Sequence, residues 1–173
     1  MKGLARGKHG RARNAGGIVT VGYSRRAQMS GSIDPTHEQF RAFMQAPQDT
    51  PIHMLNLIRL RAVAAYPPDH PNHGKGMSGL DAYRAYGRES EKVFSRVGGK
   101  QVWVGRPEVV VIGPEAERWD LAFIAGYPNA LAFAEMVRDP EYKEHVKHRQ
   151  AAVEDSRLIR MLPFSPGAGF GET

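Results

Sequence analysis

The pattern of apolar and polar residues predicts strands, and two of them are apolar on both faces. Successive side chains of a strand point to opposite faces. In residues 52–60 one face carries Ile52, Met54, Asn56, Ile58 and Leu60, and the other carries His53, Leu55, Leu57 and Arg59. Residues 119–127 are apolar at nearly every position. A strand with one face in water alternates apolar and polar residues, so we expect both faces of these two strands to be covered.

Further extended segments follow later in the chain. Residues 100–106 and 109–112 are predicted to form one strand, and Pro107 interrupts it, which is typical of an edge or a bulge. Residues 156–162 form the last predicted strand. The long segment 61–77 is dense in Pro, Gly and His, and loops of this length often serve as lids or binding loops.

Apolar residues at helical spacing predict helices between these strands. The longest covers residues 79–97, with Ser78 as its N-cap and Gly98-Gly99 at its end. A second helical segment covers residues 130–137, and a third begins at Asp139-Pro140.

The order of these elements, β-α-β-β-α-β, predicts an α+β protein with a ferredoxin-like fold. In this fold an antiparallel sheet is covered by helices on one face. Because the strands 52–60 and 119–127 are apolar on both faces, the other face also needs a cover. The economical cover is a second copy of the chain, so we expect a homodimeric α/β barrel in which two sheets pack against each other.

One folded domain is predicted over residues 34–163. Asp34 is expected to cap a short helix, with Pro35 at its first position. Residues 1–33 are predicted to be a disordered basic extension, and residues 164–173 a flexible tail rich in Gly and Pro. Three interpretations of residues 1–28 stay open. The segment is a disordered extension translated upstream of a true start at Met29, an organellar transit peptide, or a basic arm for nucleic acid or anionic lipid.

Composition narrows the classes of partner. The net charge of +6 arises in residues 1–28, which hold seven basic residues and no acid, and residues 29–173 carry 17 basic against 18 acidic residues. We therefore expect no nucleic-acid binding by the folded domain, since such binding needs clustered cations. No apolar run is long enough to span a bilayer, so no membrane partner is expected. Cysteine is absent, which suits a cytoplasmic location and excludes thiolate chemistry.

Several spaced motifs within residues 52–162 resemble one bacterial family. They are Val97-Gly98-Gly99 before Val102-Trp103-Val104-Gly105, Trp119-Asp120 before an apolar strand, Tyr127-Pro128, Asp139-Pro140-Glu141-Tyr142, and His148-Arg149 leading to Glu154-Asp155-Ser156. Together they are similar to the family catalogued as domain of unknown function 1330, in the dimeric α/β-barrel group. The resemblance implies the ferredoxin-like fold and no particular activity. Other members of that group include cofactor-independent monooxygenases, lactone isomerases and haem proteins, but a shared fold is weak warrant for shared chemistry.

Four residues are candidates for the wall of a ligand pocket, either between sheet and helices or at the mouth of the barrel. Asn56 interrupts an apolar strand face, so its amide needs polar partners there. Tyr83, Tyr86 and Trp103 combine an apolar ring with one polar atom, which suits a small aromatic ligand. Ordinary core packing with satisfied polar atoms is the alternative for each of them.

Arg149 is the fifth candidate. It shares a helical stripe with Tyr142, Val146 and Val153, the face that should pack on the sheet. A partly buried arginine needs a partner, which is predicted to be the carboxylate of Asp120 or Asp155, or an anionic ligand. A salt bridge that fixes the helix is the alternative to substrate binding.

No cofactor or metal is expected. Gly74-Lys75-Gly76-Met77-Ser78-Gly79 is a literal GxGxxG, but no strand precedes it directly, as a dinucleotide site requires. Two groups of possible metal ligands, Asp69, His70 and His73, and Glu141, His145 and His148, lack the context of a known metal motif.

Three functions stay open. The first is a homodimer that binds a small organic or aromatic molecule through Asn56, Tyr83, Tyr86, Trp103 and Arg149. The second is a cofactor-independent enzyme, resembling a monooxygenase or an isomerase. Its catalytic candidates are His53, Tyr83 and Arg149. His53 or a Tyr hydroxyl would act as acid or base, while Asn56 and Arg149 would hold an anionic intermediate. The third is a structural dimer without a ligand.

Overall fold

The computed structural model describes residues 31–165 and 167. The elements follow the chain in the order α1 (His37–Gln45), β1 (Ile52–Leu60), α2 (Gly79–Arg96), β2 (Lys100–Gly105), β3 (Leu121–Tyr127), α3 (Ala130–Arg138), α4 (Pro140–Ala152) and β4 (Val153–Met161). The four strands form one antiparallel sheet in the order β2-β3-β1-β4. This is the predicted ferredoxin-like β-α-β-β-α-β topology, with α1 added in front of it.

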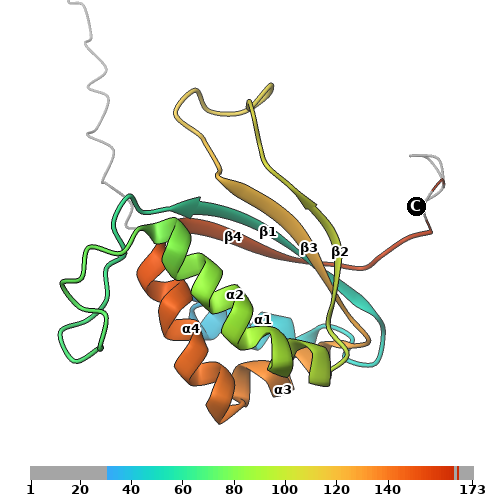
Figure 1. Ribbon diagram of the computed structural model, residues 1–173. Coiled ribbons are helices and arrows are strands. Elements are labelled where there is room, and N and C mark those ends of the chain that lie inside the picture. Colours follow the sequence, from blue (N-terminus) through green and yellow to red (C-terminus); the bar gives the residue numbers. More distant parts are fainter. Residues whose placement is uncertain (1–30, 166, 168–173) are drawn as a thin grey trace, which may run out of the picture.

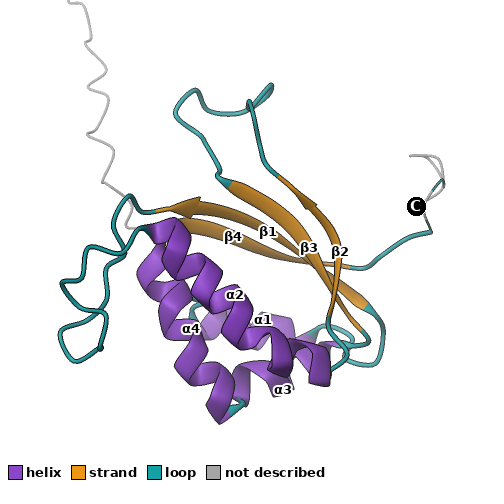
Figure 2. Ribbon diagram, in the orientation of Figure 1, coloured by secondary structure: helices purple, strands orange, loops and turns teal. Residues whose placement is uncertain are grey.

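The helices lie on one side of the sheet, and no helix of the described part covers the other side (Figure 1, Figure 2). The face of β1 that points to the helices is almost completely buried, with Ile52 1%, Met54 3% and Ile58 0% exposed. Fully burying one such side chain stabilises a fold by about 1.5–3 kcal/mol. The main core therefore lies between the sheet and the layer of α2, α3 and α4.

The ends of the long helix agree with the prediction from the sequence. Ser78 is the N-cap of α2, and its hydroxyl accepts a hydrogen bond from the backbone N–H of Asp81. After the helix, Gly98 has a φ of 80°, in the left-handed region that glycine reaches without steric cost. The turn into β2 is therefore set by local sequence.

The first helix begins later than predicted. Thr36, not Asp34, is the N-cap of α1, and it forms a capping box with Gln39, in which each side chain bonds the backbone N–H of the other. Pro35 therefore precedes the helix. Asp34 instead accepts a hydrogen bond of 3.0 Å from the side chain of Gln150 in α4.

The predicted strand over residues 109–112 is wrong. β2 ends at Gly105, and the connection from β2 to β3 rises away from the sheet (Figure 1). Val109, Val111 and Ile112 are 76%, 85% and 95% exposed. Pro107 lacks a backbone N–H and cannot continue the ladder of hydrogen bonds. β3 accordingly begins at Leu121 rather than at residue 119.

Most of the predicted terminal segments lie outside the described residues. Residues 1–30 of the expected extension are not described, whereas Ser32 and Ile33 make hydrogen bonds to α4 and β4. Within the described part, no helix is both long and apolar enough to cross a membrane.

Candidate functional site

A cavity of about 970 Å³ lies between the sheet and the helices. The elements around it are α1, α2, α3 and α4 together with all the strands of the sheet, so it occupies the middle of the domain. Much of its wall is aromatic or apolar, including Phe40, Phe43, Met54, Phe94, Phe123 and Phe133. A volume of this size is at the upper end of the range for pockets that hold drug-sized ligands.

Helix α1 closes one side of this cavity. The ring of Phe43 lies 5.1 Å from the ring of Phe133 in α3, measured between centroids. At the end of the helix, Arg160 of β4 donates a hydrogen bond of 3.0 Å to the carbonyl oxygen of Phe43, and its guanidinium lies over the Phe43 ring. Arg160 thus fastens the C-terminal end of the helix to β4.

One position of α2 that lines the cavity carries no side chain. Gly87 lines the cavity in the middle of α2, and a Cβ atom built on it would meet nothing within 4 Å. Glycine in a helix interior costs about 1 kcal/mol relative to alanine. This position therefore keeps space in the cavity at the expense of helix stability.

Asn56 lies in the cavity wall, as the interrupted strand pattern predicts. It is 7% exposed, and its amide donates a hydrogen bond of 2.9 Å to the carbonyl oxygen of Met54. No other hydrogen bond of this amide is present among the described residues. The side chain therefore retains hydrogen-bonding capacity beside the cavity.

Tyrosine side chains of α2 and α4 also meet at the cavity. The hydroxyl oxygens of Tyr86 and Tyr142 are 3.0 Å apart, and the rings of Tyr83 and Tyr86 are 5.5 Å apart. Burial raises the pKa of Tyr83 and of Tyr142 well above the ordinary value of 10.0. Both phenols are therefore neutral at physiological pH, and they act as hydrogen-bonding groups rather than as bases.

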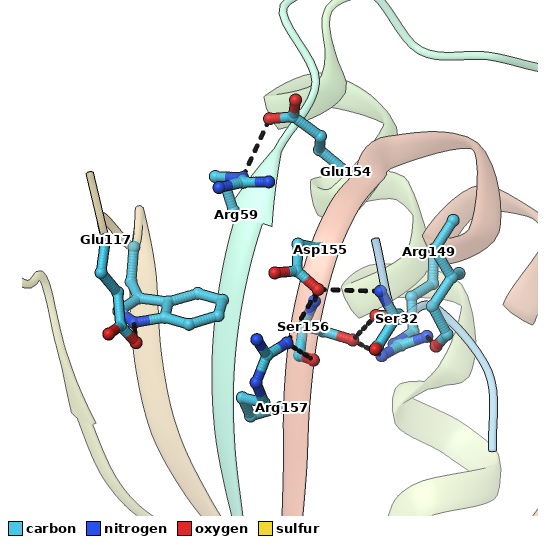
Figure 3. Close-up of polar contacts among 10 residues, drawn as sticks. Ser32, Arg59, Glu117, Arg149, Glu154, Asp155, Ser156 and Arg157 are labelled. Atoms are coloured by element: carbon cyan, nitrogen blue, oxygen red, sulfur yellow. Dashed lines mark hydrogen bonds and ion pairs between the residues drawn. The ribbon is translucent and has the colours of Figure 1, made fainter. Parts of the chain in front are cut away.

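Arg149 lines the cavity but is bonded to the protein. Its side chain is 11% exposed, and it donates hydrogen bonds to the carbonyl oxygen of Ile33 at 2.6 Å and to the hydroxyl of Ser156 at 3.1 Å (Figure 3). The carboxylate of Asp34 is 3.9 Å away. Arg149 therefore pairs with neither Asp120 nor Asp155, the carboxylates expected from the sequence. Through Ile33 and Ser156 it fastens the segment in front of α1 to β4.

Asp155 holds the same segment from the other side. Its carboxylate accepts hydrogen bonds of 2.8 Å from the backbone N–H of Ser32 and 2.8 Å from the side chain of Arg157 (Figure 3). Burial raises the pKa of Asp155, but these bonds and the one from the Ser156 N–H outweigh burial and lower the pKa below 3.8. The charged form of Asp155 is thus stabilised by the fold.

His53 and Trp103 lie on the opposite face of the sheet. Trp103 pairs with Ile124 of β3, which pairs with Leu55 of β1, and Leu55 points away from the buried Met54 and Asn56. Trp103 is 52% exposed. The cavity therefore brings together Asn56, Tyr83, Tyr86 and Arg149, but neither His53 nor Trp103 lines it.

The histidines of α4 form a different arrangement from a metal site. Glu89 of α2 pairs with both His145, at 3.2 Å, and His148, at 3.1 Å, and His148 also contacts the hydroxyl of Tyr66 at 2.6 Å. Glu141 instead pairs with Lys92 of α2. Among residues 31–165 and 167, no group of three or more His or acidic side chains has the arrangement of a metal site. This cluster fastens the loop 61–77 to the helices.

Sequence reasoning missed several residues of the cavity wall. Ser90 and Glu91 of α2 and Ser156 of β4 are polar, and they line the cavity beside the apolar side chains. Ser90 lies on the same helical stripe as Tyr83 and Tyr86, so the periodicity of α2 contains a signal for it. Nothing in the local sequence marks Ser156, whose position depends on the pairing of β4 with β1.

Comparisons with known proteins give relatives of unknown function. The crystal structure of the RPA0582 protein of unknown function from Rhodopseudomonas palustris is 57% identical, has a TM-score of 0.72, and the match covers 79% of this chain and 99% of that chain. The methylated RPA0582 protein is 56% identical, with a TM-score of 0.74 over 80% of this chain and 99% of that chain. A search of the curated proteins finds no match.

A more distant structure, of a dimeric protein of unknown function and ferredoxin-like fold from Bacteroides fragilis NCTC 9343, is 15% identical, with a TM-score of 0.42 over 65% of this chain and 96% of that chain. This likeness is too remote to support an argument. Residues 77–161 match the family described as domain of unknown function, DUF1330, as the sequence motifs predict. With this match and the 57% identity over nearly all of a solved relative, the chain belongs to the DUF1330 family.

Proposed function

We propose that this protein is a homodimer that binds a small, partly aromatic organic molecule in the cavity between the sheet and the helices. The observation that carries the proposal is the cavity of about 970 Å³, whose wall combines aromatic and apolar side chains with polar ones. Apolar walls supply affinity, and a few fixed polar groups orient the ligand. Asn56 and the hydroxyls of Tyr83 and Tyr86 are the groups available for that orientation.

The cavity favours binding over the two alternatives. A structural dimer without a ligand needs a filled interior, whereas a cavity of about 970 Å³ lies between the sheet and the helices. A cofactor-independent enzyme needs a base that faces the ligand. The raised pKa values of Tyr83 and Tyr142, caused by burial, make these phenols poor bases, and His53 lies on the other face of the sheet.

The homodimer part of the proposal concerns the uncovered face of the sheet, which we call the outer face. It carries Leu55, Ile124, Ile159, Val102 and Trp103. Of these, Val102, Trp103 and Ile159 are 51%, 52% and 47% exposed. Contiguous exposed apolar surface of this kind marks an interaction site. A second copy offers the same apolar surface, so pairing of the two outer faces would bury both sets of side chains.

Titration with the neutral fluorescent probe phenylnaphthylamine tests ligand binding. We expect saturable binding to the native protein, and at least about tenfold weaker binding to Gly87→Phe, because the new ring occupies the cavity. Arg88→Phe is the control, since Arg88 is exposed on the same helix and does not line the cavity. Equal binding by native protein and Gly87→Phe, with both variants folded by circular dichroism, would refute the cavity as the binding site.

A further inference from the structure

A second hollow lies directly beside the cavity. This groove has a volume of about 1040 Å³. It is lined by residues 60–63 and 65, by Ser78, Leu80, Tyr83 and Arg84 at the start of α2, by residues at the two ends of the β2–β3 connection, and by Glu154. Tyr83 and Leu121 line both hollows. The groove and the cavity therefore adjoin at these two residues.

The groove carries an excess of positive charge. Four arginines line it, namely Arg61, Arg84, Arg106 and Arg118, against two acids, Asp120 and Glu154. Glu154 already pairs with Arg59 at 3.0 Å, and Asp120 accepts a hydrogen bond of 2.7 Å from the backbone N–H of Leu60. The acids of the groove are thus already engaged with other groups.

Three of these arginines lack an acidic partner. Arg84 pairs with Asp81 at 3.2 Å, but no carboxylate of residues 31–165 lies within 4.0 Å of a nitrogen of Arg61, Arg106 or Arg118. The Nε atom of Arg61 is also buried without a hydrogen-bond partner in this part of the chain. Arg106 and Arg118 are exposed, so their guanidinium groups can meet an anion from solvent.

The three arginines that line the cavity, Arg149, Arg157 and Arg160, are not available in the same way. Arg149 donates to Ile33 and Ser156, and the carboxylate of Asp34 is nearby. Arg157 pairs with Asp155 at 2.8 Å, and Arg160 donates to the carbonyl oxygen of Phe43. An anionic group of a ligand placed in the cavity would lose its hydration. It would also meet guanidinium groups that already donate their hydrogen bonds to the protein. The groove, by contrast, offers arginines without acidic partners at the edge of solvent.

We propose that the natural ligand is an amphiphilic organic anion. Its apolar or aromatic body occupies the cavity, and its carboxylate or phosphate group lies in the groove against Arg61, Arg106 and Arg118. The planar guanidinium group binds either anion through paired hydrogen bonds. This assignment rests on the proposed binding function and adds the charge class of the ligand and the residues that recognise it.

A matched pair of fluorescent probes tests the assignment. Phenylnaphthylamine is neutral, and anilinonaphthalene sulfonate has the same rings with one added anionic group. The groove variant is the double substitution Arg106→Ala and Arg118→Ala. Its control is Arg88→Ala with Arg138→Ala, which removes the same charge from exposed positions outside both hollows. Titrations are made at one fixed salt concentration, because exposed charges are screened by salt.

We expect the groove variant to bind the sulfonate about tenfold more weakly than native protein, and the neutral probe with unchanged affinity. The control should change the affinity for either probe less than about twofold. Binding of both probes with no difference between groove variant and control would overturn the groove assignment and leave the cavity proposal intact. If Gly87→Phe changes the affinity for neither probe, the cavity proposal fails, and the groove assignment fails with it.

Displacement of the bound sulfonate separates the two kinds of anion. Naphthoate and naphthyl phosphate share their rings with the neutral naphthol. We expect at least one of the two anions to displace the probe from native protein at a lower concentration than naphthol, and this advantage to disappear in the groove variant. The anion with the greater advantage identifies the carboxylate or the phosphate class. Equal potency of naphthol and both anions would count against an anion site.

Discussion

Replacing Arg149 by methionine distinguishes an arginine that fastens the chain from one that binds a ligand. Methionine retains an unbranched apolar stem and removes the guanidinium. The change abolishes the hydrogen bonds to the carbonyl oxygen of Ile33 and to the hydroxyl of Ser156. Hydrogen bonds from a charged donor contribute about 1.5–3 kcal/mol each, and methionine recovers part of the packing. We therefore expect Arg149→Met to lower the free energy of unfolding by about 2–4 kcal/mol.

Urea unfolding at neutral pH measures this loss, and Asp34→Asn is the matched control. The Asp34 carboxylate is 52% exposed and 3.9 Å from Arg149, so the charge on that side contributes less than about 1 kcal/mol. Limited proteolysis should also cut Arg149→Met faster than native protein near residues 31–36, because the segment loses its attachment to β4.

A small effect of Arg149→Met on stability would refute this reasoning. If the free energy of unfolding changes by less than about 1 kcal/mol while affinity for phenylnaphthylamine falls at least about tenfold, Arg149 contributes to ligand binding rather than to the attachment of the N-terminal segment. Equal destabilisation by Arg149→Met and Asp34→Asn would assign the effect to the ion pair and not to the bonds with Ile33 and Ser156.

Three further predictions concern other parts of the fold. The native protein should have the mass of a dimer in light scattering. Trp103→Glu places a charge on the outer face at a half-exposed position, so this variant should have the mass of a monomer with unchanged circular dichroism. A native monomer would contradict the outer-face pairing. Gly87→Ala should raise the free energy of unfolding by about 1 kcal/mol in urea, because no atom lies near the new methyl group; destabilisation would mean that the space is not open. The fold lowers the pKa of Asp155 below 3.8, so the stabilisation by its charged carboxylate is present above that pH and is lost as pH falls through the folded-state pKa. The free energy of unfolding of Asp155→Asn should therefore fall less steeply with acidification below pH 3.8 than that of native protein. Identical slopes in urea unfolding would contradict the shift.

The sequence determined the order of elements and most of the faces because these depend on local periodicity. The alternation in residues 52–60 divides β1 into two faces, but both are mainly apolar, and the structure is what places the face with Asn56 under the helices. Ser78 and Gly98-Gly99 mark the ends of α2 through caps formed by neighbouring residues. The start of α1 was missed because Asp34-Pro35 and the Thr36–Gln39 capping box are adjacent and compete for the same role.

Only the tertiary structure decided which distant residues meet. The register of β2 on β3 places Trp103 on the outer face, away from the cavity that Tyr83 and Tyr86 line. The return of the chain before α1 brings Ile33 to Arg149, a partner that lies 116 positions away in sequence. Side-chain periodicity specifies faces of single elements, whereas contacts across the fold depend on strand register and helix packing, which no local pattern encodes. The arginine groove is the clearest case, because Arg61, Arg106 and Arg118 come together only when β3 is paired with both β1 and β2.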